Sequence, residues 1–212
     1  MNMTTKTLFA AAVAGLAFAG SASAALIPVA SYVYDGAGGE AAGAQPSTFL
    51  TNFADTGTAE LTDGFVVTTG GFDQAGYVGF RDLNADDGTS QPQVTFDFGS
   101  LYDVSTIDVS YRDVEGTIQE PDAVFISVSS NGVDYSTPVS FGPFVGTGGS
   151  GVTTTLDVSG LADARYYRLD FRQDVEWLLL SEVAFDGTAV PEPGSLALLG
   201  LGGLCVLRRR RG

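Results

Sequence analysis

The chain has 212 residues, with 10 basic and 25 acidic side chains and a formal net charge of −15. It contains no histidine, which excludes Ser-His-Asp catalysis and removes both the commonest general base and the usual zinc ligand. A strongly negative chain repels a phosphate backbone, so nucleic-acid binding is not expected either.

The first 24 residues have the pattern of a secretory signal peptide. Lys6 precedes an uncharged, mostly apolar stretch at 8–19, and the small residues Ala22 and Ala24 follow it. A positive start, a short apolar run and an Ala-x-Ala site define such a segment, which is removed from the mature protein. We therefore expect signal peptidase to cleave before Ala25 and the protein to be exported.

The body of the chain, residues 25–189, has the size of a single domain. It holds five arginines and 24 acidic residues, and thus a net charge of −19. The one cysteine, Cys205, lies outside it. Without a disulfide, we expect an exported domain to be stabilised by its packing or by bound ions.

Short β-type segments separated by turn residues run through this body. Several alternate between apolar and polar residues, as at Tyr167, Leu169 and Phe171. Because side chains alternate between the two faces of a strand, this pattern places the apolar residues in a core and the polar residues in water. The expected strands are 32–34, 65–69, 77–80, 93–98, 106–112, 123–129, 153–158, 165–172 and 178–185. Recurring short strands without a helix pattern predict an all-β, antiparallel β-sandwich.

The C-terminal end has three parts in a fixed order. Val190-Pro191-Glu192-Pro193 is followed by 12 uncharged residues at 196–207 and then by Arg208, Arg209, Arg210 and Arg211. A stable membrane helix needs about 20 apolar residues, so this run is short for a permanent anchor. The arginines would keep their end of it on the cytoplasmic side.

This order resembles the PEP-CTERM sorting signal. The resemblance implies that an exosortase recognises Pro191, Glu192 and Pro193 and removes the tail. It also implies that the protein passes through a membrane-tethered intermediate to the cell surface or an exopolysaccharide matrix. The alternative is an ordinary C-terminal anchor behind a proline-rich linker.

Three segments of the body, in this order, resemble the discoidin-type, galactose-binding-like jelly roll. The first is Ala-Glu-Leu-Thr-Asp-Gly at 59–64, and the second is a strand that leads into Ser-Asn-Gly, at 121–135. The third is Ala-Arg-Tyr-Tyr-Arg-Leu-Asp-Phe at 164–171, which is followed by Trp177 and by Ser-Glu-Val at 181–183. The resemblance implies a jelly-roll sandwich. The tryptophan that the family carries soon after its Asp-Gly loop is missing here.

In that family the early loop and the closing strand often share a calcium ion. The matching positions are Leu61, through its carbonyl, Asp63 and Glu182. Calcium takes six to eight oxygen ligands, from carboxylates and carbonyls. Alternatively, Asp63 makes a local turn before Gly64 and Glu182 is a surface charge.

A second cation site is conceivable at Asp82, Asn84 and Asp86. These residues alternate as at the start of a calcium loop, but Asp87 stands where an EF-hand needs glycine and Gln93 where it needs glutamate. No helix pattern flanks the segment, which favours a solvated loop.

Polysaccharide binding would use aromatic rings and polar side chains, and Tyr166, Arg168 and Trp177 are the leading candidates. Other aromatic residues that could present a flat face at a loop end are Tyr77, Tyr102, Tyr135 and Phe144. The alternation of the strand at 165–172 turns Tyr166 and Arg168 outward, whereas Trp177 precedes an apolar run and fits a core position as well. The arginines at 112, 165, 168 and 172 are expected to pair internally with Asp or Glu; the alternative is that they hold an acidic sugar.

The sequence thus predicts a signal peptide at 1–24, a sandwich domain at 25–189 and a sorting signal at 190–212. We expect an exported, non-catalytic protein that binds extracellular polysaccharide, with calcium in a structural role. A matrix or adhesion protein without a small ligand is the alternative. A glycoside hydrolase using Asp170, Asp174 and Glu176 is disfavoured, because closely spaced acids are common in so acidic a chain.

Overall fold

The computed structural model describes residues 25–34, 60–68, 75–81, 92–114, 116, 118–146, 148, 151–173 and 177–191. Within these ranges the chain forms nine strands, and all pairs between them are antiparallel. They are β1 (Ala25–Leu26), β2 (Ser31–Tyr34), β3 (Val78–Arg81), β4 (Gln93–Tyr111), β5 (Ala123–Ser129), β6 (Val139–Phe141), β7 (Val152–Asp157), β8 (Ala164–Arg172) and β9 (Trp177–Ala189). The predicted all-β, antiparallel fold class is confirmed.

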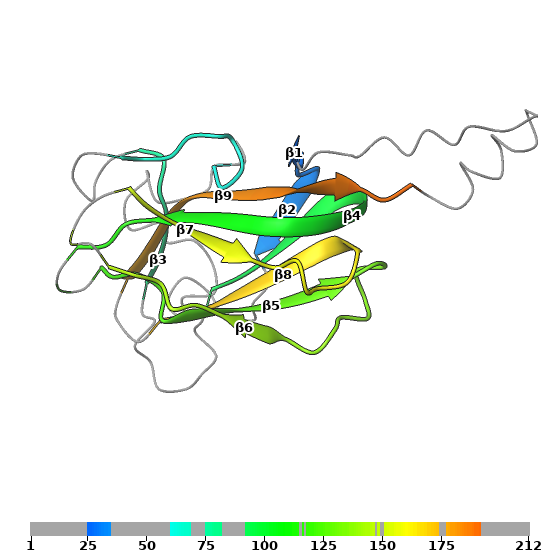
Figure 1. The fold of residues 1–212 in the computed structure, drawn as a ribbon. Helices are drawn as coiled ribbons and strands as arrows, with labels where there is room; N and C mark the ends of the chain where they lie inside the picture. Colours follow the sequence, from blue (N-terminus) through cyan, green and yellow to red (C-terminus); the bar gives the residue numbers. More distant parts are fainter. Residues whose placement is uncertain are drawn as a thin grey trace, which may run out of the picture.

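Strand β4 joins two layers, as Figure 1 shows with β9 and β4 lying over β8, β5 and β6. Its first half pairs with β2 and β8, and β8 continues the first layer to β5 and β6. Its second half pairs with β9 and β7, and β1 and β3 add to the two ends of β9. The pairing register with β8 shifts between Asp97 and Tyr102. Gly99 lies in this bulge with φ of +76°, a conformation that favours glycine.

The core lies between the two layers. Phe185 of β9 contacts Phe98 and Phe96 of β4 with ring centroids 4.9 and 5.0 Å apart, and Tyr167 of β8 at 6.1 Å. All four side chains are buried. The alternating apolar residues of the sequence therefore meet face to face across the sandwich.

Some strands differ from the sequence prediction. The segments 93–98 and 106–112 belong to one continuous strand, because the glycine between them makes a bulge and not a turn. Residues 65–68 form no strand: the Phe65 amide donates to Asp63 Oδ1 at 2.7 Å, which turns the chain, and Phe65 is 57% exposed. Strands β1 and β6 were not predicted, because with two and three residues they are too short for a periodic pattern to be recognised.

The two ends of the described body lie at the same end of the sheet. Ala25 is paired with Gly187, and the Ile27 amide donates to the Phe185 carbonyl at 2.7 Å. Beyond β9 the Val190 amide donates to the Leu101 carbonyl at 3.0 Å. No helix within the described ranges is long and apolar enough to cross a membrane. The expected signal peptide at 1–24 and the apolar run at 196–207 lie outside the described residues.

Candidate functional site

The outward side of β8 gathers most of the body's arginines. Tyr167, Leu169 and Phe171 point into the core and are fully buried, so the intervening residues form the outer face of the first layer. They are the half-buried Tyr166, Arg168, Asp170 and Arg172. We call this set, together with Arg165, the β8 row. The predicted outward orientation of Tyr166 and Arg168 is confirmed.

Arg168 is at the centre of the β8 row, between two small hydroxyl residues. Thr95 of β4 and Ser127 of β5 flank it in register, and both are buried. Its Nε donates to Thr95 Oγ1 at 3.2 Å.

Tyr135 lies over the same guanidinium, with the Arg168 Cζ atom 3.8 Å from its ring centroid. The loop after β5 brings it there. Ser129 Oγ accepts from the amides of Asn131 and Gly132, and Asn131 Oδ1 accepts from the amides of Val133 and Asp134. These bonds fold the loop back over β5, so the stacked pair is held by a hydrogen-bonded turn.

Two ion pairs close the ends of the β8 row. Arg165 donates from Nε and Nη2 to the two carboxylate oxygens of Asp97 at 2.6 and 2.7 Å. This two-point contact lowers the pKa of Asp97. Arg172 donates to Asp170 at 2.7 Å, although burial of Asp170 raises the pKa of that carboxyl despite the neighbouring arginine. The expected internal pairing of arginines with acids is thus confirmed at both ends.

Trp177 does not join the β8 row. It lies at the start of β9, in the second layer, and packs against the buried Val67, Tyr77 and Leu179. The structure therefore brings Tyr166 and Arg168 together and places Trp177 elsewhere.

The residues expected to hold calcium lie where the early loop meets β9. Glu182 is 6% exposed, and its Oε2 accepts from the Gly64 amide at 3.1 Å. Burial, together with the charge of Asp63 and a hydrogen bond from it, raises the pKa of Glu182 to about 7. Glu182 is therefore not a surface charge, whereas Asp63 does make the local turn that the alternative foresaw.

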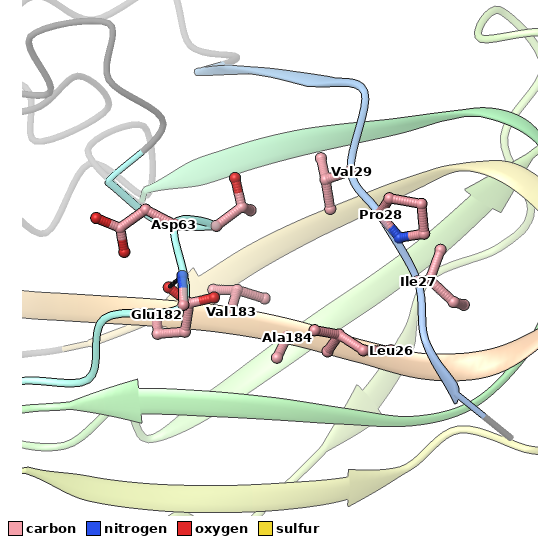
Figure 2. A pocket seen from close by; sticks show the side chains of 10 residues that line it. Leu26, Ile27, Pro28, Val29, Asp63, Glu182, Val183 and Ala184 are labelled. Carbon is pink, nitrogen blue, oxygen red and sulfur yellow. Dashed lines mark hydrogen bonds between the residues drawn. The ribbon is translucent and has the colours of Figure 1, made fainter.

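A cavity of ≈ 170 Å³ adjoins these two carboxylates. Figure 2 shows Asp63 and Glu182 at one end of it and the segment from Leu26 to Val29 at the other. The Leu61 carbonyl accepts from the Val183 amide at 2.7 Å, so one of its two lone pairs is already used. Among the described residues no three His, Cys, Asp or Glu side chains come together. The second candidate, Asp82, Asn84 and Asp86, lies outside the described residues.

Another carboxylate pair was not foreseen. Asp113, which is buried, accepts from the Gly148 amide at 2.6 Å, and Glu120 accepts from the Gly146 amide at 3.2 Å. Both carboxylates approach Gly146 so closely that a Cβ there would lie 2.7 Å from Glu120 and 2.8 Å from Asp113. Tyr135 was one of the aromatic residues considered for sugar stacking, but its contact with Arg168 was not predicted. Its position depends on the loop that carries it, which no periodic pattern encodes.

Residues 189–211 match the family model of the PEP-CTERM protein-sorting motif. The chain ends in a PEP-CTERM motif. The match includes the predicted residues Pro191, Glu192 and Pro193 and the arginines at 208–211. It begins at the last residue of β9, so the motif follows the sandwich directly.

Solved structures similar to this chain include domains of three other proteins. One is the C-terminal domain of a chitobiase from Bacteroides fragilis, with 17% identity, a TM-score of 0.48, and coverage of 77% of this chain and 95% of that one. Another is the CBM32 of AlyQ in complex with 4,5-unsaturated mannuronic acid, with 13% identity, a TM-score of 0.42, and coverage of 76% and 97%. A third is an F5/8 type C domain from Bacteroides fragilis, with 12% identity, a TM-score of 0.44, and coverage of 62% and 80%.

A search of curated proteins finds no match.

Proposed function

We propose that this protein is exported, is sorted by an exosortase through its PEP-CTERM motif, and binds extracellular polysaccharide without catalysing a reaction. The observation that carries the binding is the β8 row. There Tyr166, Arg168 and Tyr135 bring two aromatic rings and a guanidinium to one outer face of the sheet. Rings contact the apolar faces of sugars, and a guanidinium donates hydrogen bonds to their oxygens.

The sorting part of the proposal is supported by the motif match and by the geometry of β9. The strand runs to Ala189, and Val190 is still hydrogen-bonded to Leu101. With no linker between sandwich and motif, the domain would lie close to the membrane until the tail is removed. Signal peptidase and the exosortase would be its partners during export, and its destination would be the cell surface or extracellular matrix.

A structural calcium ion belongs to the same proposal. The buried Glu182 with its neighbour Asp63 supplies carboxylate oxygens, which calcium prefers, and the Leu61 carbonyl retains a second lone pair. The raised pKa of the buried Glu182 carboxyl is what a nearby cation would relieve. These residues would tie the early loop to the closing strand in a body without a disulfide.

Binding is tested by pull-down of the full chain, purified in mild detergent, with immobilised neutral and acidic polysaccharides. We expect retention on at least one class, and weaker retention when Tyr135→Ser removes the ring over Arg168. Absence of retention on every polymer, with and without added calcium, would refute the binding function.

Sorting is tested by replacing Pro191, Glu192 and Pro193 together with alanine in the cell that makes the protein. We expect the variant to accumulate in the membrane fraction at precursor mass, since the tail is no longer recognised. Normal delivery and normal mature mass would show that the motif is not used.

A matrix protein without a defined small ligand is the second candidate, and the outer face of the second layer favours it. Asp108, Asp157 and Asp186 lie there among Thr106, Thr153, Thr155 and Ser110. Such a surface is hydrated and attracts cations. This candidate predicts calcium-dependent association with mixed matrix material, and no measurable affinity for a purified polysaccharide.

A further inference from the structure

Residues 188–190, which we call the terminal strap, continue β9 beyond its last core residue. The strap pairs with β4, and the Val190 amide donates to the Leu101 carbonyl at 3.0 Å. On the other side of β9, strand β1 pairs only as far as Gly187. Within the described ranges the strap therefore has a single neighbouring strand.

A bulge in β4 separates the strap from the rest of β9. Val104 lies opposite Gly187, and Thr106 lies opposite Asp186. Ser105 is therefore an extra residue of β4 at this point, and its Oγ donates to the Asp186 carbonyl at 3.0 Å. Bulges commonly mark the place where strand pairing ends. Gly187 beside the bulge has the widest choice of backbone angles, so the chain can pivot there.

The strap is held mainly by its backbone pairing. Phe185 is the last residue of β9 in the hydrophobic core. Beyond it Thr188 and Val190 are half-buried, and Ala189 is exposed. A segment at the end of an element with few buried apolar contacts opens locally at a low cost in free energy. Detachment of the strap therefore leaves the core in place.

The match to the sorting motif begins at residue 189, within this paired segment, and Pro191 follows the strap directly. Extended peptides are commonly recognised through their main-chain hydrogen-bonding groups. The Val190 amide already donates to Leu101, so it cannot donate to an enzyme until the strap leaves β4. A residue before proline is biased away from the helical region, so a detached Val190 stays extended.

We propose that the terminal strap is a releasable part of the sorting signal. It detaches from β4 with Gly187 as the pivot and gives the sorting enzyme an extended peptide on the N-terminal side of Pro191. Detachment precedes the cut, and the sandwich stays folded. This inference rests on the proposed sorting and names the segment of the folded domain that the enzyme takes up.

The test locks the strap to β4 with a disulfide. The Val190 amide donates to the Leu101 carbonyl. In an antiparallel ladder the next pair, Tyr102–Ala189, is then of the non-hydrogen-bonded type, with Cα atoms about 4.5 Å apart. That spacing suits a disulfide. The locked variant is Tyr102→Cys with Ala189→Cys, in a chain where Cys205→Ser leaves no other cysteine. Its matched control has serine at the same three positions.

A second variant supplies unpaired residues before the motif. The insertion of Gly-Ser-Thr-Ala between Ala189 and Val190 repeats the Thr-Ala that precedes Val190 in the native chain. The enzyme then meets the same residues without opening the strap. The insertion is made in the native chain and in the locked variant. Conversion from precursor to mature mass is followed by pulse–chase in the cell that makes the protein, and non-reducing electrophoresis shows whether the disulfide has formed.

We expect the locked variant to stay at precursor mass while its serine control is converted, and the insertion to restore conversion of the locked variant. In the native chain the insertion should speed conversion. Equal conversion of the locked variant, with its disulfide formed, and the serine control would overturn the inference. So would a locked variant that the insertion does not rescue. If the disulfide does not form or the serine control is not converted, the insertion in the native chain decides, and conversion no faster than without it overturns the inference.

Replacement of Pro191, Glu192 and Pro193 by alanine in the same assay separates this inference from the proposed sorting. Normal conversion of the alanine variant would mean that the motif is not used, and both would fail. A blocked alanine variant together with an unaffected locked variant would leave the sorting standing and overturn only the release of the strap.

Discussion

Glu182 of the closing strand accepts a hydrogen bond from the backbone amide of Gly64, a residue 118 positions earlier in the chain. The contact joins the early loop to β9 and holds a carboxyl group in a buried position next to Asp63. We expect this contact to make the stability of the domain depend on pH and, through the proposed calcium ion, on cations.

The metal-free protein should lose stability as pH rises from about 4.5 to 7. Burial raises the pKa of Glu182 from 4.5 to about 7, so in this interval the folded state binds more protons than the unfolded state. Stability then falls with increasing pH. We expect Tm, measured in a chelator, to decrease across this interval in the native chain and to decrease clearly less in Glu182→Gln, where the raised pKa of Asp170 still acts.

Added calcium should restore Tm of the native chain near neutral pH and leave Glu182→Gln unaffected. Asp63→Asn is the companion variant, since it removes the neighbouring charge and keeps an oxygen for the turn to Phe65. A Tm that follows the same course with pH in the native chain and in Glu182→Gln would contradict this account of the pair.

The Arg165–Asp97 pair should respond to pH in the opposite sense. The arginine lowers the pKa of Asp97, so the stabilisation is present above the ordinary pKa of an aspartate and is lost as pH falls through the folded value. Asp97→Asn should lower Tm at neutral pH, modestly because the pair is partly exposed, and the difference should vanish in strong acid.

The control for Asp97 is Asp163→Asn, an exposed aspartate between β7 and β8. It changes the net charge equally and breaks no two-point ion pair. If Asp97→Asn and Asp163→Asn lowered Tm by the same amount at neutral pH, long-range charge and not the contact would be the cause.

Strand β8 of the first layer could be predicted from sequence because its two faces differ in polarity. Tyr167, Leu169 and Phe171 alternate with polar residues, and this alternation predicted both the strand and the outward orientation of Tyr166 and Arg168. The structure has both. The continuity of β4 could not be predicted in this way. Gly99 is typical of a turn in sequence, and only the pairing of both halves of β4 with neighbouring strands shows that it makes a bulge.

The candidate site depended on contacts that no local pattern contains. Tyr135 reaches Arg168 through a loop whose shape is set by Ser129 and Asn131. The burial of Glu182 follows from a bulge in β9. Before the bulge the core residues are the even-numbered Leu178 and Leu180, and after it they are the odd-numbered Val183 and Phe185. This change of phase turns Glu182 toward the early loop, where its partner is provided by the tertiary fold.

Gly187 is expected to be intolerant of any side chain. A Cβ there would overlap the Asp103 carbonyl oxygen and lie 2.8 Å from the Val104 Cα atom. Both are backbone atoms of the adjacent β4, so they cannot rotate away. Gly187→Ala should lower the free energy of unfolding by ~1–3 kcal/mol, measured by urea denaturation.

Gly160→Ala is the matched control for Gly187. Gly160 lies in the turn after β7 and has no atom within 4 Å of the position that its Cβ would take. The substitution should leave the urea midpoint almost unchanged. Equal losses at the two glycines would mean that the close approach of β9 to β4 is relieved at little cost.

Phe185 should be the most sensitive core position among the aromatic residues where the layers meet. It is fully buried and contacts rings from β4 and β8, at 4.9 Å to Phe98 and 6.1 Å to Tyr167. Phe185→Ala removes this contact between the two layers and leaves a cavity, which costs about 3–5 kcal/mol for a buried phenylalanine. Phe65→Ala, at a side chain 57% exposed, should cost far less. Urea denaturation of both variants checks the difference, and similar losses would mean that Phe185 does not join the layers.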